Sequence, residues 1–292
     1  MKNMFFIVFI FITGFISCCR TIETIDNNIT NSPFIKEENI LEQTKKSVLK
    51  IVSISEVILT NKNNNKSILK EIIIKTGSGS ILEQSLSGTF ILTAAHVCTV
   101  YNEKQINMIF PLIKYSEEFY DLKSNDEYII VDTNGGKYMA YLLAINYNDD
   151  TCILLSEKIF ISPLIIINRD IRSAEKSYAL GFPLGIWEKY YVPIYSGYYS
   201  GLLEFEKGFR SSFSIPSAPG LSGGPIINSE GYIIGMIHSY MSDFNVLSLS
   251  ATIRQIKSIL NEAKEIYATK QSIYDYLISS SSTITPPIYS IQ

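Results

Sequence analysis

Histidine and tryptophan are scarce in this chain of 292 residues, which contains two histidines and one tryptophan. Two histidines cannot supply a typical zinc site, and no Cys-x-x-Cys pair accompanies them, so we expect no metal and no other cofactor. A net charge of −3 provides no basic surface for nucleic acid. The apolar run Met4–Ile16 is shorter than the roughly 20 residues that a membrane-spanning helix needs.

That short apolar run instead predicts an export signal over residues 1–18, because a basic start precedes it and a small residue, Ser17, follows it. The ending at residues 15–18, Phe-Ile-Ser-Cys, resembles the lipobox of bacterial lipoproteins, although Phe15 stands where an aliphatic residue is usual. The resemblance implies lipidation of Cys18 and attachment of the exported chain to a membrane. Simple secretion and an uncleaved anchor are the alternatives.

Two of the four cysteines, Cys98 and Cys152, lie beyond this N-terminal segment. An exported chain permits a disulfide between them. Both cysteines stand among apolar residues, however, so we expect buried free thiols that act as small hydrophobic side chains.

The rest of the chain divides into a polar linker over residues 19–46, a folded domain over 47–262, and a C-terminal extension over 263–292. The linker contains a weak helical pattern at 37–46. The domain contains many short apolar runs separated by glycine, proline and asparagine, which favours β-barrels or sandwiches over βαβ units. From Ala251 the apolar spacing becomes helical, and this helix is expected to continue into the extension before a loose tail. The strands expected in the domain cover residues 48–54, 68–74, 77–82, 88–93, 127–131, 137–145, 150–155, 164–167, 177–185, 190–196, 197–205, 225–227 and 232–238.

A glycine-rich turn at residues 220–225, Gly-Leu-Ser-Gly-Gly-Pro, is typical of a nucleophilic serine surrounded by inward-facing N–H groups. His96 follows the apolar run at residues 90–95, and Asp150 stands at the head of another apolar run. His, Asp, Ser is one of the chain orders in which catalytic triads occur. Asp149 competes with Asp150 for the acidic position; we favour Asp150 because the apolar run begins directly after it.

These segments together resemble the trypsin-like peptidases, in particular the HtrA-type branch, over residues 47–262. Leu221 departs from the asparagine or aspartate usual at that position, and no PDZ-like domain is expected after residue 262. The resemblance implies an all-β fold of two six-stranded antiparallel β-barrels, here followed by a C-terminal α-helix. The matching motifs are residues 77–79, 91–97, 150–154, 181–185, 196–197, 219–225 and 231–235.

The resemblance also implies the roles of the residues. Ser222 would be the nucleophile, His96 the general base and Asp150 the group that orients the imidazole. The N–H groups of Gly220 and Ser222 would form the oxyanion hole. The predicted function is an exported serine endopeptidase that acts on proteins or peptides through an acyl-enzyme. The alternatives are a catalytically silent scaffold on the same fold and a protease that processes itself.

Specificity is predicted from the residues that would line the primary pocket. The resemblance makes Pro216 its floor, with Ser217 beside it, and makes residues 235–240 its wall, which includes His238, Ser239 and Tyr240. No carboxylate lies in either stretch, which disfavours cleavage after Arg or Lys. A preference for small or medium apolar residues is expected. His238 could instead accept an acidic side chain, or could bond Asp150.

Overall fold

The structure is a computed structural model that describes residues 33–85, 88–99, 119–241 and 244–280. The expected export signal, Cys18 and the end of the tail lie outside these residues. The chain divides into two units, Met1–Thr44 and Lys45–Gln292. The described element that begins in the first unit is helix α2, Pro33–Lys45, which extends the weak helical pattern by four residues toward the N-terminus. Everything below concerns the second unit.

The first barrel is a closed antiparallel sheet in the order β1-β2-β3-β6-β5-β4. Its interior is filled by strand residues with no exposed surface, such as Ile51, Ile91 and Ile153. Alternate residues of β1 are buried, which is the period of two expected when one face of a strand is covered. The strands are β1 (Val48–Asn61), β2 (Lys66–Gln84), β3 (Thr89–Thr93), β4 (Tyr120–Val131), β5 (Lys137–Asn146) and β6 (Thr151–Ser156).

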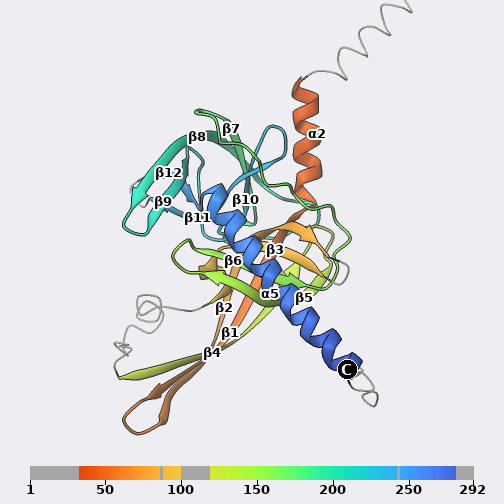
Figure 1. The fold of residues 1–292 in the computed structure, drawn as a ribbon. Coiled ribbons are helices and arrows are strands. Elements are labelled where there is room, and N and C mark those ends of the chain that lie inside the picture. The colour runs from red at the N-terminus through yellow and green to blue at the C-terminus, as the bar shows by residue number, and fades with distance from the viewer. Residues whose placement is uncertain (1–32, 86–87, 100–118, 242–243, 281–292) are drawn as a thin grey trace, which may run out of the picture. The chain divides into compact units, whose positions relative to one another are not determined.

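The second barrel is closed in the order β10-β11-β12-β9-β8-β7, and its core includes Phe213, Leu221 and Ile237. The prediction of two six-stranded antiparallel barrels followed by a C-terminal helix is therefore confirmed (Figure 1). The strands are β7 (Lys176–Leu180), β8 (Ile194–Phe205), β9 (Gly208–Phe213), β10 (Pro225–Asn228), β11 (Ile233–Met241) and β12 (Phe244–Ser250).

Helix α5, Ile253–Ser280, begins at a capping box. The Thr252 N–H donates to Gln255 Oε1 at 2.7 Å, and the Gln255 N–H donates to Thr252 Oγ1 at 3.3 Å. The helix returns to the first barrel, where the rings of Tyr267 and Phe90 meet edge to face with centroids 5.4 Å apart. It passes without interruption through residue 263, and its apolar face is buried there as the helical spacing predicted.

Several strand predictions were wrong in their bounds. The runs at 68–74 and 77–82 belong to one strand, β2, because β1 continues to pair with it from Val48 to Asn61. β4 begins at Tyr120 instead of residue 127, since it pairs with the same length of β1. Within residues 164–167 only Ile166 forms an isolated bridge, and no strand is present. Residues 181–185 lie outside β7 and include a 3-10 turn, and residues 190–193 lie outside β8. Strands β9 and β12 were not predicted.

The long β1–β2–β4 pairing produces a three-stranded arm, defined here as residues 54–61, 66–74 and 120–127. β5 meets β4 only at residues 128–131, and β3 meets β2 only at residues 80–84. Figure 1 shows β1, β2 and β4 reaching beyond the other strands of that barrel.

Candidate active site

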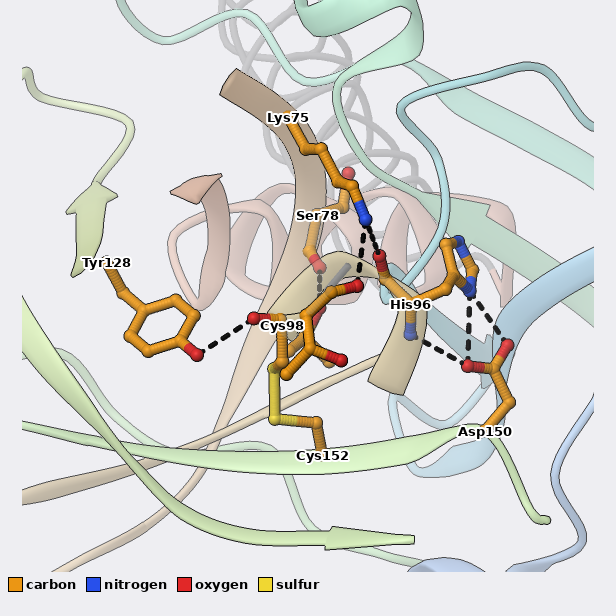
Figure 2. Close-up of a disulfide and its surroundings, with 9 residues drawn as sticks. Lys75, Ser78, His96, Cys98, Tyr128, Asp150 and Cys152 are labelled. Atoms are coloured by element: carbon orange, nitrogen blue, oxygen red, sulfur yellow. Dashed lines mark hydrogen bonds and ion pairs between the residues drawn. A yellow bond between two sulfur atoms is a disulfide. The ribbon is translucent and has the colours of Figure 1, made fainter. Parts of the chain in front are cut away.

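His96 and Asp150 form a close pair in the first barrel. His96 lies in α3 (Ala95–Cys98), a single turn that follows β3. Its Nδ1 lies 2.8 Å from Asp150 Oδ2 and 3.1 Å from Oδ1, and its backbone N–H donates to Oδ1 at 3.0 Å (Figure 2). The Asp150 carbonyl accepts the Ala95 N–H at 3.2 Å. One aspartate thus fixes both the turn and the imidazole, and the ring's Nε2 remains for another partner.

Asp149, the competing acid, points to a different set of groups. Gln255 Nε2 donates to Asp149 Oδ1 at 2.6 Å, and Arg210 Nη1 lies 3.8 Å from the same oxygen. Arg210 also donates to the Asn148 carbonyl. Through these contacts, Arg210 of the second barrel and Gln255 of α5 both bind the turn that precedes β6 in the first barrel. Asp150 itself adopts φ = 53°, a left-handed conformation that aspartate tolerates better than most residues.

The turn that carries Ser222 requires its glycines. Gly220 and Gly223 have φ values of 91° and 86°, which side chains rarely permit. A Cβ atom on Gly223 would lie 2.1 Å from the Ser78 carbonyl oxygen, and one on Gly220 would lie 2.5 Å from the Phe182 carbonyl oxygen. The glycines at residues 220–225 are therefore explained by close backbone packing. Part of this packing is against the first barrel.

The carbonyl groups of this turn are anchored, which orients its N–H groups. Pro219 O, in the same peptide as the Gly220 N–H, accepts the Leu184 N–H at 2.6 Å, and Leu221 O, in the same peptide as the Ser222 N–H, accepts the Gly224 N–H at 2.9 Å. A trans peptide directs its N–H away from its C=O, so the Gly220 N–H points away from Leu184. Within the described part of the chain, the N–H groups of Gly220 and Ser222 have no protein acceptor.

A cavity of about 490 Å³ brings the predicted residues of the two barrels together. Pro216, the expected floor of the pocket, is exposed and does not line this cavity. The side chain of Tyr240 lies outside the described residues. The lining consists of Lys75, Thr76, His96, Val97, Ser217, Ala218, Pro219, Gly220, Ser222, His238 and Ser239.

His238 faces the same carboxylate as His96. Its Nδ1 lies 2.9 Å from Ser239 Oγ and 3.5 Å from Asp150 Oδ2. Burial, which Asp150 only partly offsets, lowers the pKa of His238 to about 4, so the ring is neutral near pH 7. Its Nε2 is buried and has no hydrogen-bond partner within the described residues.

Cys98 and Cys152 form a disulfide, and the prediction of free thiols was wrong. Thr93 of β3 pairs with Cys152 of β6, and the α3 turn that follows β3 folds back so that the two Cα atoms lie 6.7 Å apart. Both residues are fully buried, as expected. Each cysteine stands two positions after one member of the His96–Asp150 pair. Figure 2 shows the disulfide and this pair.

Lys75 is a cavity residue that the sequence reasoning missed. Its Nζ donates to the carbonyl oxygens of Thr99 at 2.8 Å and His96 at 3.1 Å, at the end of the α3 turn (Figure 2). Burial lowers the pKa of Lys75 to about 8. Only the register of β2 beside α3 brings this lysine to the site, and no local sequence pattern indicates it.

Two further kinds of feature are absent from residues 33–85, 88–99, 119–241 and 244–280. These residues contain no cluster of three or more His, Cys, Asp or Glu side chains that could bind a metal ion. Among the described helices, none combines the length and apolarity that crossing a membrane requires.

Residues 77–236, more than half of the chain, match the family described as trypsin-like peptidase domain. The chain therefore belongs to the trypsin-like peptidases. No curated protein matches the chain in sequence.

Solved structures with the same fold include the active form of the Rv3671c protease from M. tuberculosis. It is 15% identical, with a TM-score of 0.55, over 77% of this chain and 83% of that chain. An inactive form of the Rv3671c protease is 14% identical, with a TM-score of 0.53, over 77% of this chain and 92% of that chain. At these identities the similarity shows the fold.

Proposed function

We propose that this chain is an exported serine endopeptidase of the HtrA-type branch that hydrolyses peptide bonds through a His96–Asp150–Ser222 triad. The observation that carries the proposal is that the His96–Asp150 pair and Ser222, from different barrels, meet at one cavity. A serine hydroxyl needs an adjacent base to act as a nucleophile, and histidine is the usual one.

The geometry supports a specific catalytic role for each of these residues. Because Nδ1 of His96 faces Asp150, Nε2 is the nitrogen that takes the proton of Ser222 Oγ as that oxygen attacks the carbonyl carbon. The N–H groups of Gly220 and Ser222, which have no acceptor among the described residues, stabilise the oxyanion. The scissile C–N bond then breaks as His96 gives its proton to the leaving amine. Water releases the acyl group by the same steps, with His96 again as base.

The chemistry of the cavity supports a preference for small or medium apolar residues before the scissile bond. No carboxylate is among its lining residues, so a buried arginine or lysine would lack a partner. The His238 side chain is only 9% exposed and its Nε2 is buried, so the ring offers little surface to an acidic side chain. The apolar preference is therefore favoured over cleavage after acidic residues.

Export is part of the proposal. The Cys98–Cys152 disulfide supports it, because disulfides persist in oxidising compartments outside the cytosol. We propose that residues 1–18 direct export and that Cys18 carries a lipid anchor. Metabolic labelling with palmitate should mark the wild type and leave Cys18→Ser unlabelled; an intact N-terminus at residue 1 on the exported chain would contradict cleavage.

Cleavage of a peptide library by the purified chain tests the activity. We expect hydrolysis after Val, Ala or Leu by the wild type, and a loss of at least about a thousandfold in Ser222→Ala and in His96→Ala. The thermal midpoint of Ser222→Ala should remain close to that of the wild type. A correctly folded wild-type chain that cleaves no peptide would instead favour a silent scaffold.

A further inference from the structure

The orientation of the Gly220 N–H depends on a neighbouring turn at residues 182–185. The carbonyl of the peptide that carries this N–H, Pro219 O, accepts the Leu184 N–H at 2.6 Å. The two segments are in close contact, since a Cβ on Gly220 would lie 2.5 Å from the Phe182 carbonyl oxygen and 2.8 Å from the Leu184 nitrogen. Rotation of this peptide would break the bond from Leu184 and turn the Gly220 N–H away from a developing oxyanion.

The turn at residues 182–185 contains a strained residue. Leu184 has φ = 55°, in the left-handed region that leucine adopts only at a cost in free energy. Its side chain is 70% exposed, so the packing of that side chain contributes little to fixing the backbone. The conformation of the turn must therefore be held by contacts that its other residues make.

Two paired residues of the first barrel make such contacts. Lys50 of β1 stands opposite Ser78 of β2. Lys50 Nζ donates to the Gly185 carbonyl oxygen at 2.7 Å. Ser78 Oγ accepts the Phe182 N–H at 2.9 Å and donates to the Gly220 carbonyl oxygen at 2.7 Å. The two side chains thus hold the first and the last residue of the turn.

Lys50 reaches the turn because successive residues of β1 face opposite sides of the sheet. Leu49 and Ile51 have no exposed surface and fill the first barrel, so the side chain of Lys50 points out of that barrel. The turn is packed closely against β2, where a Cβ on Gly185 would lie 2.7 Å from Thr76 Oγ1. Lys50 is half-buried. An ammonium group that has lost part of its water needs an acceptor, and the Gly185 carbonyl supplies one.

We propose that Lys50 is a positioning residue for the oxyanion hole. By holding the Gly185 carbonyl from the first barrel, it keeps the neighbouring Leu184 N–H on the 219–220 peptide. That bond in turn keeps the Gly220 N–H directed into the cavity. The inference rests on the proposed function. Lys50 itself does not line the cavity, so its effect passes through the backbone of the turn. Its loss should slow the chemical step and leave substrate binding unchanged.

The first experiment measures kcat and KM for Lys50→Met, which retains an unbranched apolar side chain and removes the donor. We expect kcat to fall by about thirtyfold, less than the roughly hundredfold or more that follows the loss of an oxyanion-hole donor. KM should remain within about twofold of the wild-type value. Lys50→Arg, which retains a donor, should recover most of the loss. A wild-type kcat in Lys50→Met, or a higher KM at unchanged kcat, overturns the proposal.

Lys264→Met is the matched control for the loss of a lysine that joins two elements. Lys264 Nζ of α5 donates to Glu83 Oε2 of β2 at 2.9 Å, and neither residue lines the cavity. Urea unfolding is measured for both lysine variants. We expect Lys264→Met to retain the kcat of the wild type. A kcat that falls equally in the two variants would show that any lost link between elements slows the reaction, and the proposal would be wrong.

A peptide aldehyde tests the oxyanion hole directly. When Ser222 Oγ bonds to the aldehyde carbon, the carbonyl electron pair moves to oxygen and His96 takes the serine proton, so the adduct places an oxyanion in the hole. Its inhibition constant should rise by the same factor by which kcat/KM falls in Lys50→Met. The uncleaved peptide should bind Ser222→Ala with the same Kd whether or not Lys50→Met is added. An unchanged inhibition constant overturns the proposal.

The strain at Leu184 allows a rescue experiment. Glycine adopts a positive φ without the cost that leucine incurs, so a turn with Leu184→Gly depends less on being held. Leu184→Gly should therefore recover part of the kcat that Lys50→Met loses, and it should have little effect in the wild type. A double variant with a kcat as low as that of Lys50→Met would contradict a role that passes through this turn.

Hydrogen exchange separates this inference from the proposed function. Exchange of the Leu184 amide is followed by mass spectrometry in the wild type, Lys50→Met and Lys50→Arg. We expect exchange at least about tenfold faster in Lys50→Met, and close to the wild-type rate in Lys50→Arg. If this result is found while the wild type hydrolyses nothing, only the proposed activity fails. Equal exchange in the three chains overturns the role of Lys50 even if peptides are cleaved.

Discussion

The two barrels position their contributions to the site in different ways. The first barrel binds His96 to Asp150 directly and joins Cys98 to Cys152, two positions after each of them. The second barrel holds Ser222 on a turn of glycines that has no such covalent tie, and packs that turn against Ser78 of the first barrel. The proposed base and its proposed acidic partner are thus assembled within one barrel. The position of the serine depends on how closely the two barrels approach.

The second barrel has no disulfide among its described residues; it contains a buried carboxylate, Glu175, that pairs with an arginine. Glu175 accepts hydrogen bonds from Arg169 at 2.6 and 2.8 Å and from Asn228 at 3.0 Å. These bonds lower the pKa of Glu175 to about 2, against the opposing effect of its burial. The two barrels should therefore respond to different treatments, the first to reduction and the second to acid.

The largest expected effect comes from adding one methyl group between the barrels. Gly223→Ala places a Cβ 2.1 Å from the Ser78 carbonyl oxygen and within 2.2 Å of Thr93 Oγ1, so the serine turn must move. We expect peptide hydrolysis to fall by at least about a thousandfold and the free energy of unfolding to fall by about 3 kcal/mol.

Gly208→Ala is the matched control, because Gly208 also has a positive φ, 104°, but a Cβ there would meet no atom within 4 Å. Urea unfolding and kcat/KM are measured for both variants. Equal losses in the two would show that conformational strain alone matters and that the contact with the first barrel does not.

Breaking the disulfide should have the next largest effect. The double variant Cys98→Ala/Cys152→Ala opens a link between positions 54 residues apart. We expect the free energy of unfolding to fall by about 4 kcal/mol. Because the disulfide holds the α3 turn against the strand after Asp150, kcat should fall by about tenfold with little change in KM.

Dithiothreitol provides the control for this prediction. It should reduce the wild type to the stability and kcat of the double variant, and it should leave the double variant unchanged. A wild type that loses stability but retains its full kcat after reduction would show that the disulfide does not position the pair.

A smaller effect is expected from acid, through Glu175 of the second barrel. The folded pKa of about 2 lies below the usual value of 4.5 for a glutamate, so the carboxylate contributes stability above pH 4.5, and this stability is lost as the pH falls toward 2. Glu175→Gln should reduce the free energy of unfolding by about 2 kcal/mol at pH 7. The difference between wild type and variant should shrink below pH 4.5; a constant difference down to pH 3 would contradict the assignment.

Much of the fold was accessible from the sequence because its signals are local. The glycine turn at Ser222 and the apolar run before His96 each encode a backbone geometry in adjacent residues. The register of β2 that places Lys75 beside α3, and the folding back of Cys98 over Cys152, are set by pairings between distant segments. No local pattern reveals such contacts, and for that reason the disulfide was missed and the strand at residues 66–84 was divided in two.

The predicted pocket shows the same limit. Ser217, His238 and Ser239 reach the cavity, but Pro216 remains exposed, because its position was inferred from a residue count rather than from the path of the loop. Asp150 was favoured over the neighbouring Asp149 only because the apolar run begins directly after Asp150. The structure separates their contacts, since Asp150 meets His96 whereas Asp149 meets Gln255.

The most direct test of the central claim, that His96 activates Ser222 across the two barrels, is the rate of covalent labelling by a fluorophosphonate. The reagent is applied to the wild type, Ser222→Ala and His96→Ala, and the labelled peptide is identified by mass spectrometry. The account predicts rapid labelling at Ser222, none in Ser222→Ala, and labelling at least about a hundredfold slower in His96→Ala. The account would be contradicted if the wild type remained unlabelled, or if His96→Ala were labelled at the same rate as the wild type.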